Sequence, residues 1–107
     1  QLELHRCLLD TGSAGAIFAT DQLARIGVHY EPTDIVHQIH GVGGAEFVFT
    51  KQLDRLTLDS LTVTNFEIEV GGMEYGIPID GIIGLDFLMA VQAVINLAQM
   101  RVEQTTI

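Results

Sequence analysis

The 107-residue sequence has one cysteine, two prolines and no tryptophan. The single cysteine, Cys7, excludes an internal disulfide, and no neighbouring basic cluster or histidine pattern would lower its pKa. We therefore predict that Cys7 is a small buried residue on a strand. No apolar run approaches the ~18 residues of a membrane span, and no signal peptide opens the chain, so we expect a soluble domain.

Positive charge is also scarce, with five Lys and Arg against fourteen Asp and Glu and a formal net charge of −9. Nucleic acids and anionic membranes are themselves negative, so we expect neither as a partner. Apolar residues make up 48% of the chain and charged residues 18%, a balance typical of a packed globular domain. A chain of this length predicts one core and one domain, residues 1–107.

Short apolar runs separated by turn residues every eight to twelve positions favour a mostly β fold. Residues 35–51 contain two extended segments around a glycine-rich tip, and residues 53–63 predict a second hairpin that turns at Asp59 and Ser60. The segment "NFEIEV" alternates apolar and polar side chains, which predicts a strand with one buried face. Residues 93–103 predict two short strands or one bent strand.

Two short helices interrupt this pattern. Residues 20–27 predict the first, with Thr20 or Asp21 as its cap and Gly27 at its C-terminal end. Apolar residues at helical spacing predict the second near residues 85–91. Asp86 lies in its first turn, where the helix dipole favours a negative charge, and we interpret it as a helix-start residue.

One carboxylate is placed among apolar residues in the stretch "CLLDTGSAGAIF". Asp10 follows an apolar strand, and a buried carboxylate needs hydrogen-bond donors or a second acid that shares its proton. The hydroxyls of Thr11 and Ser13 are candidate donors, and Gly12 lets the backbone turn tightly. This setting makes Asp10 a candidate catalytic residue.

Three motifs in order make the chain resemble the retropepsin-like aspartic proteases. "LLDTGS" resembles the catalytic loop of this family, "GVGG" at residues 41–44 resembles its flap tip, and "GIIGLDFL" at residues 81–88 is similar to its apolar-apolar-Gly segment before the C-terminal helix. The last motif is more like the cellular and bacterial members than the viral ones. The resemblance spans residues 8–102 and implies an all-β, closed-barrel-like fold.

The resemblance also implies an aspartic endopeptidase that works as a homodimer on a peptide or protein substrate. Asp10 would meet the Asp10 of a second copy, and the two would share one proton and hold a water that attacks the peptide bond. Thr11 would hydrogen-bond across the dimer, Gly12 would bind the substrate backbone, and Ser13 would reach the outer oxygen of Asp10.

Further site residues follow from the same resemblance. The flap would close over an extended peptide through backbone bonds. Its residues would be His40, Gly41, Val42, Gly43 and Gly44. The residues of the apolar-apolar-Gly segment, Ile82, Ile83 and Gly84, would form core or pocket beside the catalytic loop.

Two features depart from the family pattern. Viral members carry an acidic residue soon after the loop glycine and an arginine after the later glycine, whereas this chain has Ala14 or Gly15 and Leu85 there. Only nine residues precede Asp10, fewer than the N-terminal strands that often help to build the dimer sheet. We therefore expect either further residues upstream or dimerisation through the C-terminal strand near residues 94–102.

The sequence predicts no metal site and no cofactor. His37 and His40 are three residues apart, so on a strand they point to opposite faces and would not bind one ion. Two other functions remain open. One is a non-catalytic module that binds peptides or dimerises a larger protein, and the other is a monomeric precursor that matures on release from a longer chain.

Overall fold

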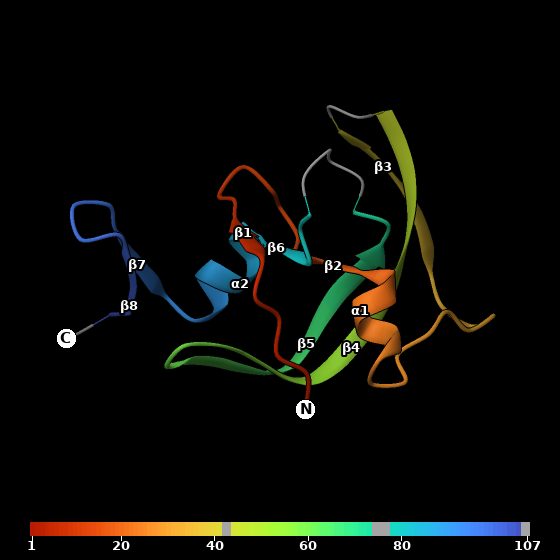
Figure 1. Ribbon diagram of the computed structural model, residues 1–107, viewed down its shortest axis with the longest axis horizontal. Coiled ribbons are helices and arrows are strands. Elements are labelled where there is room, and N and C mark those ends of the chain that lie inside the picture. Colours follow the sequence, from red (N-terminus) through yellow and green to blue (C-terminus); the bar gives the residue numbers. More distant parts are fainter. Residues whose placement is uncertain (42–43, 74–77, 106–107) are drawn as a thin grey trace.

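The computed structural model describes residues 1–41, 44–73 and 78–105 (Figure 1). Eight strands and two short helices follow one another along the chain in these ranges. The elements are β1 (Cys7–Leu9), β2 (Ile17–Ala19), α1 (Thr20–Ala24), β3 (Val36–Gly41), β4 (Gly44–Leu58), β5 (Leu61–Gly71), β6 (Gly81–Ile83), α2 (Leu85–Ala90), β7 (Ala93–Asn96) and β8 (Arg101–Gln104). The expected all-β class is confirmed.

Six strands form one curled sheet in the order β1-β6-β2-β5-β4-β3, and β7 pairs with β8 in a separate two-stranded sheet. β1 is parallel to β6 and β2 is parallel to β5, while the other pairs are antiparallel. β6 thus lies between β1 and β2, the strands that flank the loop containing Asp10. This arrangement places the catalytic-loop motif against the apolar-apolar-Gly motif.

The two predicted hairpins are present. β3 and β4 pair from Val36 with Phe49 to Gly41 with Gly44, and β4 continues into a second hairpin with β5. Asp59 adopts a positive φ of 54° in the tight turn between β4 and β5, as expected for an aspartate at such a position. In β5, Ile68 and Val70 are buried and Glu67 is exposed, which confirms the predicted alternation.

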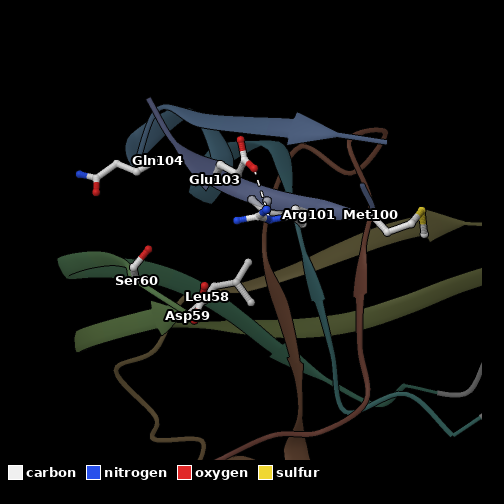
Figure 2. Close-up of a pocket in the computed structure, with 8 residues that line it drawn as sticks. Leu58, Asp59, Ser60, Met100, Arg101, Glu103 and Gln104 are labelled. Carbon is white, nitrogen blue, oxygen red and sulfur yellow. Dashed lines mark ion pairs between the residues drawn. The ribbon is translucent and has the colours of Figure 1, made fainter. Parts of the chain in front are cut away.

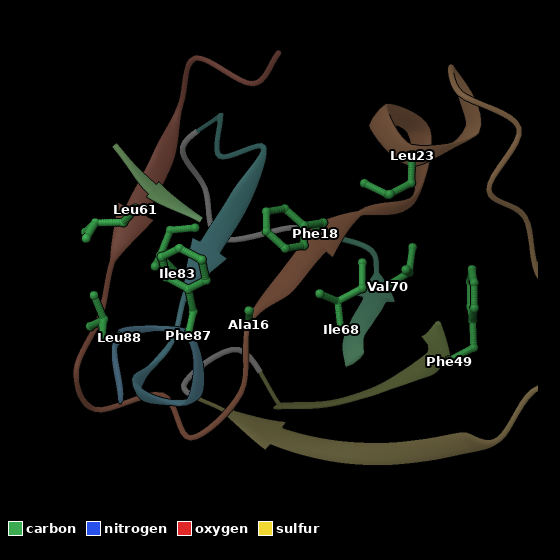
Figure 3. Close-up of a cluster of buried hydrophobic side chains, with 10 residues drawn as sticks. All are labelled: Ala16, Phe18, Leu23, Phe49, Leu61, Ile68, Val70, Ile83, Phe87 and Leu88. Carbon is green, nitrogen blue, oxygen red and sulfur yellow. The ribbon is translucent and has the colours of Figure 1, made fainter. Parts of the chain in front are cut away.

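The core lies where the curled sheet meets the two helices (Figure 3). Its largest fully buried side chains are Phe87, Ile68, Val48 and Val70. Phe87 of α2 packs edge-on against Phe66 of β5, with ring centroids 6.0 Å apart. An edge-to-face arrangement is one that aromatic pairs prefer, so this contact fixes α2 against the sheet.

Both helices occur where the periodicity predicts them but are shorter. α1 covers Thr20–Ala24 instead of residues 20–27, and a turn carries the chain to Gly27, whose φ of 77° confirms its left-handed position. The expected side-chain cap is wrong, because Ala19 occupies the capping position of α1 and no side chain bonds there. α2 ends one residue earlier than predicted, at Ala90.

The prediction that Cys7 is buried is also wrong, because Cys7 is exposed. Among the described residues β1 is an edge strand that pairs with β6 alone, and its Leu8 and Leu9 are exposed as well. Partial desolvation raises the pKa of the Cys7 thiol, and the nearby charge of Asp80 raises it further. In the part of the chain that the structure describes, no helix is long and apolar enough to cross a membrane.

Candidate active site

Asp10 lies directly after β1, at the start of the loop that leads to β2. Its backbone N–H donates to the carbonyl of Ile83 at 3.0 Å, which continues the β1–β6 pairing by one residue. One carboxylate oxygen, Oδ1, accepts the N–H of Gly12 at 2.9 Å. Asp10 is half-buried. Its main chain is bonded to β6, and its carboxylate is oriented by its own loop.

The backbone of Gly12 lies close to this carboxylate. A Cβ at position 12 would lie 3.1 Å from Oδ1 of Asp10, closer than most real Cβ contacts. A side chain at this position would require the carboxylate to shift by a few tenths of an ångström. The sequence-based placement of Gly12 beside the candidate catalytic group thus has a steric basis, whereas its proposed contact with substrate stays a prediction.

The hydroxyl of Ser13 bonds a different partner from the one expected. It donates to the carbonyl of Gly15 at 2.8 Å, whereas we expected it to reach the outer oxygen of Asp10. The Ser13 N–H donates to the carbonyl of Asp10 at 3.2 Å, which closes a tight turn. Ser13 thus stabilises the loop from within, and the exposed Thr11 is at the loop surface, where its predicted contact across a dimer stays a prediction.

The segment Ile82, Ile83 and Gly84 is buried beside the loop. A Cβ at Gly84 would lie 2.5 Å from the carbonyl oxygen of Gly15, so the two backbones pack closer than any side chain would allow. Ile82 pairs with Leu8 on one side and with Ile17 on the other. In the single chain these residues form core beneath the loop.

The predicted flap corresponds to the end of the β3–β4 hairpin, which projects from the sheet (Figure 1). Exposed His40 pairs in register with Ala45, and Gly41 with Gly44, while Val42 and Gly43 lie outside the described residues. His37 bonds the hydroxyl of Thr50 through its ring nitrogen at 3.0 Å. Within the described ranges, no group of three or more His, Cys, Asp or Glu residues is arranged to hold a metal ion.

An ion pair that the sequence did not indicate lies at the start of β1. Asp80 is buried, and its carboxylate accepts the backbone N–H of Arg6 at 3.3 Å and the guanidinium of the same residue at 3.2 Å. Burial by itself would raise the pKa of the Asp80 carboxyl, but the hydrogen bonds and charge of Arg6 outweigh it and lower the pKa. This pair joins the segments that enter β1 and β6.

Two cavities differ in their relation to the loop. The larger, of about 610 Å³, lies between the β4–β5 turn and β8 and is lined by Leu58, Asp59, Ser60 and residues 100–104 (Figure 2). It shares no lining residue with the loop that begins at Asp10. The smaller, of about 410 Å³, is lined by Ala14, Gly15 and Ala16 together with residues of β3, β4, β5 and α2. Only the smaller cavity adjoins the candidate site.

Comparison with known proteins agrees with this geometry. A family model described as aspartyl protease matches residues 3–87, which include the catalytic-loop motif and all but the last residue of the apolar-apolar-Gly motif. A solved structure, the retroviral protease-like domain of Ddi1 from Leishmania major, has 22% sequence identity and a TM-score of 0.65. The match covers 94% of this chain and 78% of that one, and at this identity it shows the fold alone. Comparison with curated proteins found no match. The chain therefore belongs to the aspartyl protease family and has the retropepsin-like fold that its catalytic-loop motif predicts.

Proposed function

We propose that the protein is an aspartic endopeptidase that acts as a homodimer, with Asp10 as its catalytic residue. The observation that carries this proposal is the placement of the Asp10 carboxylate. One oxygen is held by Gly12, and in the described part of the chain no hydrogen bond goes to the other oxygen, Oδ2. An oriented carboxylate with one oxygen available to a water suits general acid and base catalysis.

The reaction needs two such groups, and each chain has one Asp-Thr-Gly loop. In the proposed dimer, the Asp10 residues of two copies face each other and share one proton, because two adjacent carboxylates do not both ionise readily. The ionised carboxylate takes a proton from the bound water, which attacks the carbonyl carbon of the peptide bond. The protonated carboxylate polarises the carbonyl oxygen, so no covalent intermediate forms.

The exposed apolar residues favour association of two copies. Leu8 and Leu9 lie on the edge strand beside Asp10, and Val94 and Leu97 lie on or just after β7. Covering such surfaces is a driving force for association. A dimer formed through these regions would bring the two β1 edges, and with them the two Asp10 loops, towards a common axis.

A peptide substrate would enter between the loop and the β3–β4 hairpin. The hairpin tip, residues 40–44, would act as the flap and bind the peptide backbone as an added strand. The cavity of about 410 Å³ beside Ala14 and Gly15 would receive a substrate side chain; Ile39 and Ile68 line it together with the acidic residues Glu67, Glu69 and Asp86. The preference for apolar side chains next to the cleaved bond therefore rests on the family resemblance and not on this cavity.

The test is cleavage of a diverse peptide library by the parent protein and by Asp10→Asn. Asn preserves the shape of Asp but does not act as a base, so we expect a loss of about 10²- to 10⁴-fold or more in rate. The exposed Asp54→Asn on β4 is the matched control and should cleave like the parent. A pepstatin-type transition-state mimic should inhibit the parent.

Cleavage that persists in Asp10→Asn would overturn the catalytic assignment. A dimer that binds peptides but cleaves none between pH 3 and 8 would favour the non-catalytic module instead.

A further inference from the structure

The second residue of α2, Asp86, uses both carboxylate oxygens in hydrogen bonds. Oδ1 accepts the N–H of the next residue, Phe87, at 2.7 Å, as is common at a helix start. Oδ2 accepts the N–H of Ala16 at 3.2 Å, a residue 70 positions earlier in the chain. The second bond connects α2 to the end of the loop that begins at Asp10.

The backbone around Asp86 binds the same loop. The N–H of Leu85 donates to the carbonyl of Ser13 at 2.7 Å, and the N–H of Asp86 donates to the carbonyl of Ala14 at 3.3 Å. A Cβ at Gly84 would lie 2.5 Å from the carbonyl oxygen of Gly15, too close for a side chain to fit. Four consecutive loop residues, 13–16, therefore contact three consecutive residues at the start of α2.

The backbone N–H of Ala16 cannot form a hydrogen bond with water. Ala16 is completely buried, and a buried backbone N–H without an acceptor is costly. Its carbonyl accepts the N–H of Glu69 at 3.0 Å, so the Asp86 carboxylate completes the hydrogen bonding of this residue. Removal of that carboxylate would leave a buried donor at the junction between loop and β2.

The loop is thus fixed at both ends by one short segment. At its beginning, the Asp10 N–H bonds the carbonyl of Ile83, and at its end, the Ala16 N–H bonds the carboxylate of Asp86. The side chains of Ala14 and Leu85 carry no charge, so no ion pair between them adds to these hydrogen bonds. The position of the Asp10 carboxylate therefore depends on a frame built from residues 83–86.

We infer that Asp86 is a positioning residue for Asp10, which it holds in place through Ala16 and the loop between them. This inference rests on the proposed function for its catalytic consequence. A helix-dipole role alone would not require the contact with Ala16. Asp21 occupies the same second position in α1, and in the described ranges its carboxylate makes no side-chain hydrogen bond.

Asp21 therefore provides a matched control. We would compare Asp86→Ala, Asp86→Asn and Asp21→Ala with the parent dimer, measuring kcat and KM for one cleaved peptide. Small misplacement of a catalytic group costs up to about 10²-fold in rate, so we expect kcat of Asp86→Ala to fall by about 10- to 100-fold with KM changed less than about threefold. Asn keeps one acceptor oxygen and should restore part of kcat, and Asp21→Ala should match the parent.

Amide hydrogen exchange of Ala16 provides a readout that does not depend on activity. In Asp86→Ala, exchange at Ala16 should become at least about tenfold faster relative to amides of the β4–β5 hairpin, because the N–H loses its acceptor. Asp21→Ala should leave it unchanged. If Asp86→Ala fails to fold, Asp86→Asn still gives both readouts.

Unchanged Ala16 exchange and unchanged kcat in both Asp86 variants would overturn the inference. So would an equal loss of kcat in Asp86→Ala and Asp21→Ala, since that result assigns the effect to helix dipoles. If the parent cleaves no peptide, the proposed function fails, and the Ala16 exchange alone decides whether Asp86 holds the loop.

Discussion

The loop that begins at Asp10 and the hairpin of β7 and β8 differ in how completely the single chain surrounds them. The loop is packed against β6 and α2, with Ala16 and Phe87 fully buried at the junction. The hairpin packs one face on the core through residues such as Ile95 and Val102, but Leu97 is 75% exposed and Met100 is 83% exposed. One chain is thus sufficient to shape the loop, whereas the turn between β7 and β8 exposes apolar side chains that the proposed second copy would cover.

This difference predicts that the loop is intolerant of added volume. In Gly84→Ala the new Cβ would lie 2.5 Å from the Gly15 carbonyl oxygen, and backbone atoms move less readily than side chains. We expect the free energy of unfolding to fall by about 3 kcal/mol, at the upper end of overpacking costs, and peptide cleavage to be lost. Chemical denaturation and the peptide assay measure the two effects.

Gly72→Ala is the control for this substitution. Its Cβ would meet only the flexible end of the Glu46 side chain, so we expect the free energy of unfolding to change by about 0.5 kcal/mol or less. Equal destabilisation of the two variants would show that the approach of Gly84 to Gly15 is not specially constrained.

The hairpin should instead respond through association. Val94→Asp places a carboxylate on the exposed face of β7, where burial against a second copy would be costly. We expect the dissociation constant of the proposed dimer to rise at least about tenfold, or about 1.4 kcal/mol, without unfolding of the monomer. Sedimentation at several concentrations measures it.

Ile26→Asp is the matched control, because Ile26 and Val94 are both 43% exposed and Ile26 follows α1, on the other side of the molecule (Figure 1). It should leave the dimer intact. If both substitutions weaken the dimer equally, or if Val94→Asp has no effect, the interface does not include the hairpin.

The smallest expected effect concerns the ion pair of Arg6 and Asp80 near the loop. The pKa of Asp80 is lowered in the folded protein, so its stabilisation is present above the ordinary carboxyl pKa of about 3.9 and is lost as the pH falls through the folded value. Arg6→Gln should therefore lower the denaturation midpoint at pH 7, and its difference from the parent should shrink below about pH 4.

Arg25→Gln is the control for the arginine substitution. Arg25 bonds the neutral side chain of Gln22, so the effect of its replacement should not depend on pH in this range. If the denaturation midpoints of Arg6→Gln and the parent differ by the same amount from pH 7 to pH 2.5, the ionised Asp80 carboxylate does not stabilise the fold through Arg6.

Local patterns in the sequence predicted most strands and both helices because side-chain alternation and helical spacing reflect burial of one face. They did not predict the hydrogen bond from the Ser13 hydroxyl to the Gly15 carbonyl, because the sequence offers two acceptors near this hydroxyl, that carbonyl and the Asp10 carboxylate. Nor did they predict the contact of Asp86 with Ala16, because a helix-start aspartate looks the same whether or not a distant loop lies beside it. Asp80 had no local partner in the sequence either.

By itself, the sequence determined the all-β class, the β4–β5 turn and the identity of the candidate catalytic loop, because each depends on residues close together in the chain. The tertiary structure decided which residues are exposed at a sheet edge, as with Cys7, and which distant groups complete the loop, as with Asp86. The physical reason is that strand order and backbone packing bring together residues about 70 positions apart. Hydrogen bonds between such residues depend on the assembled fold and leave no periodic signal along the chain.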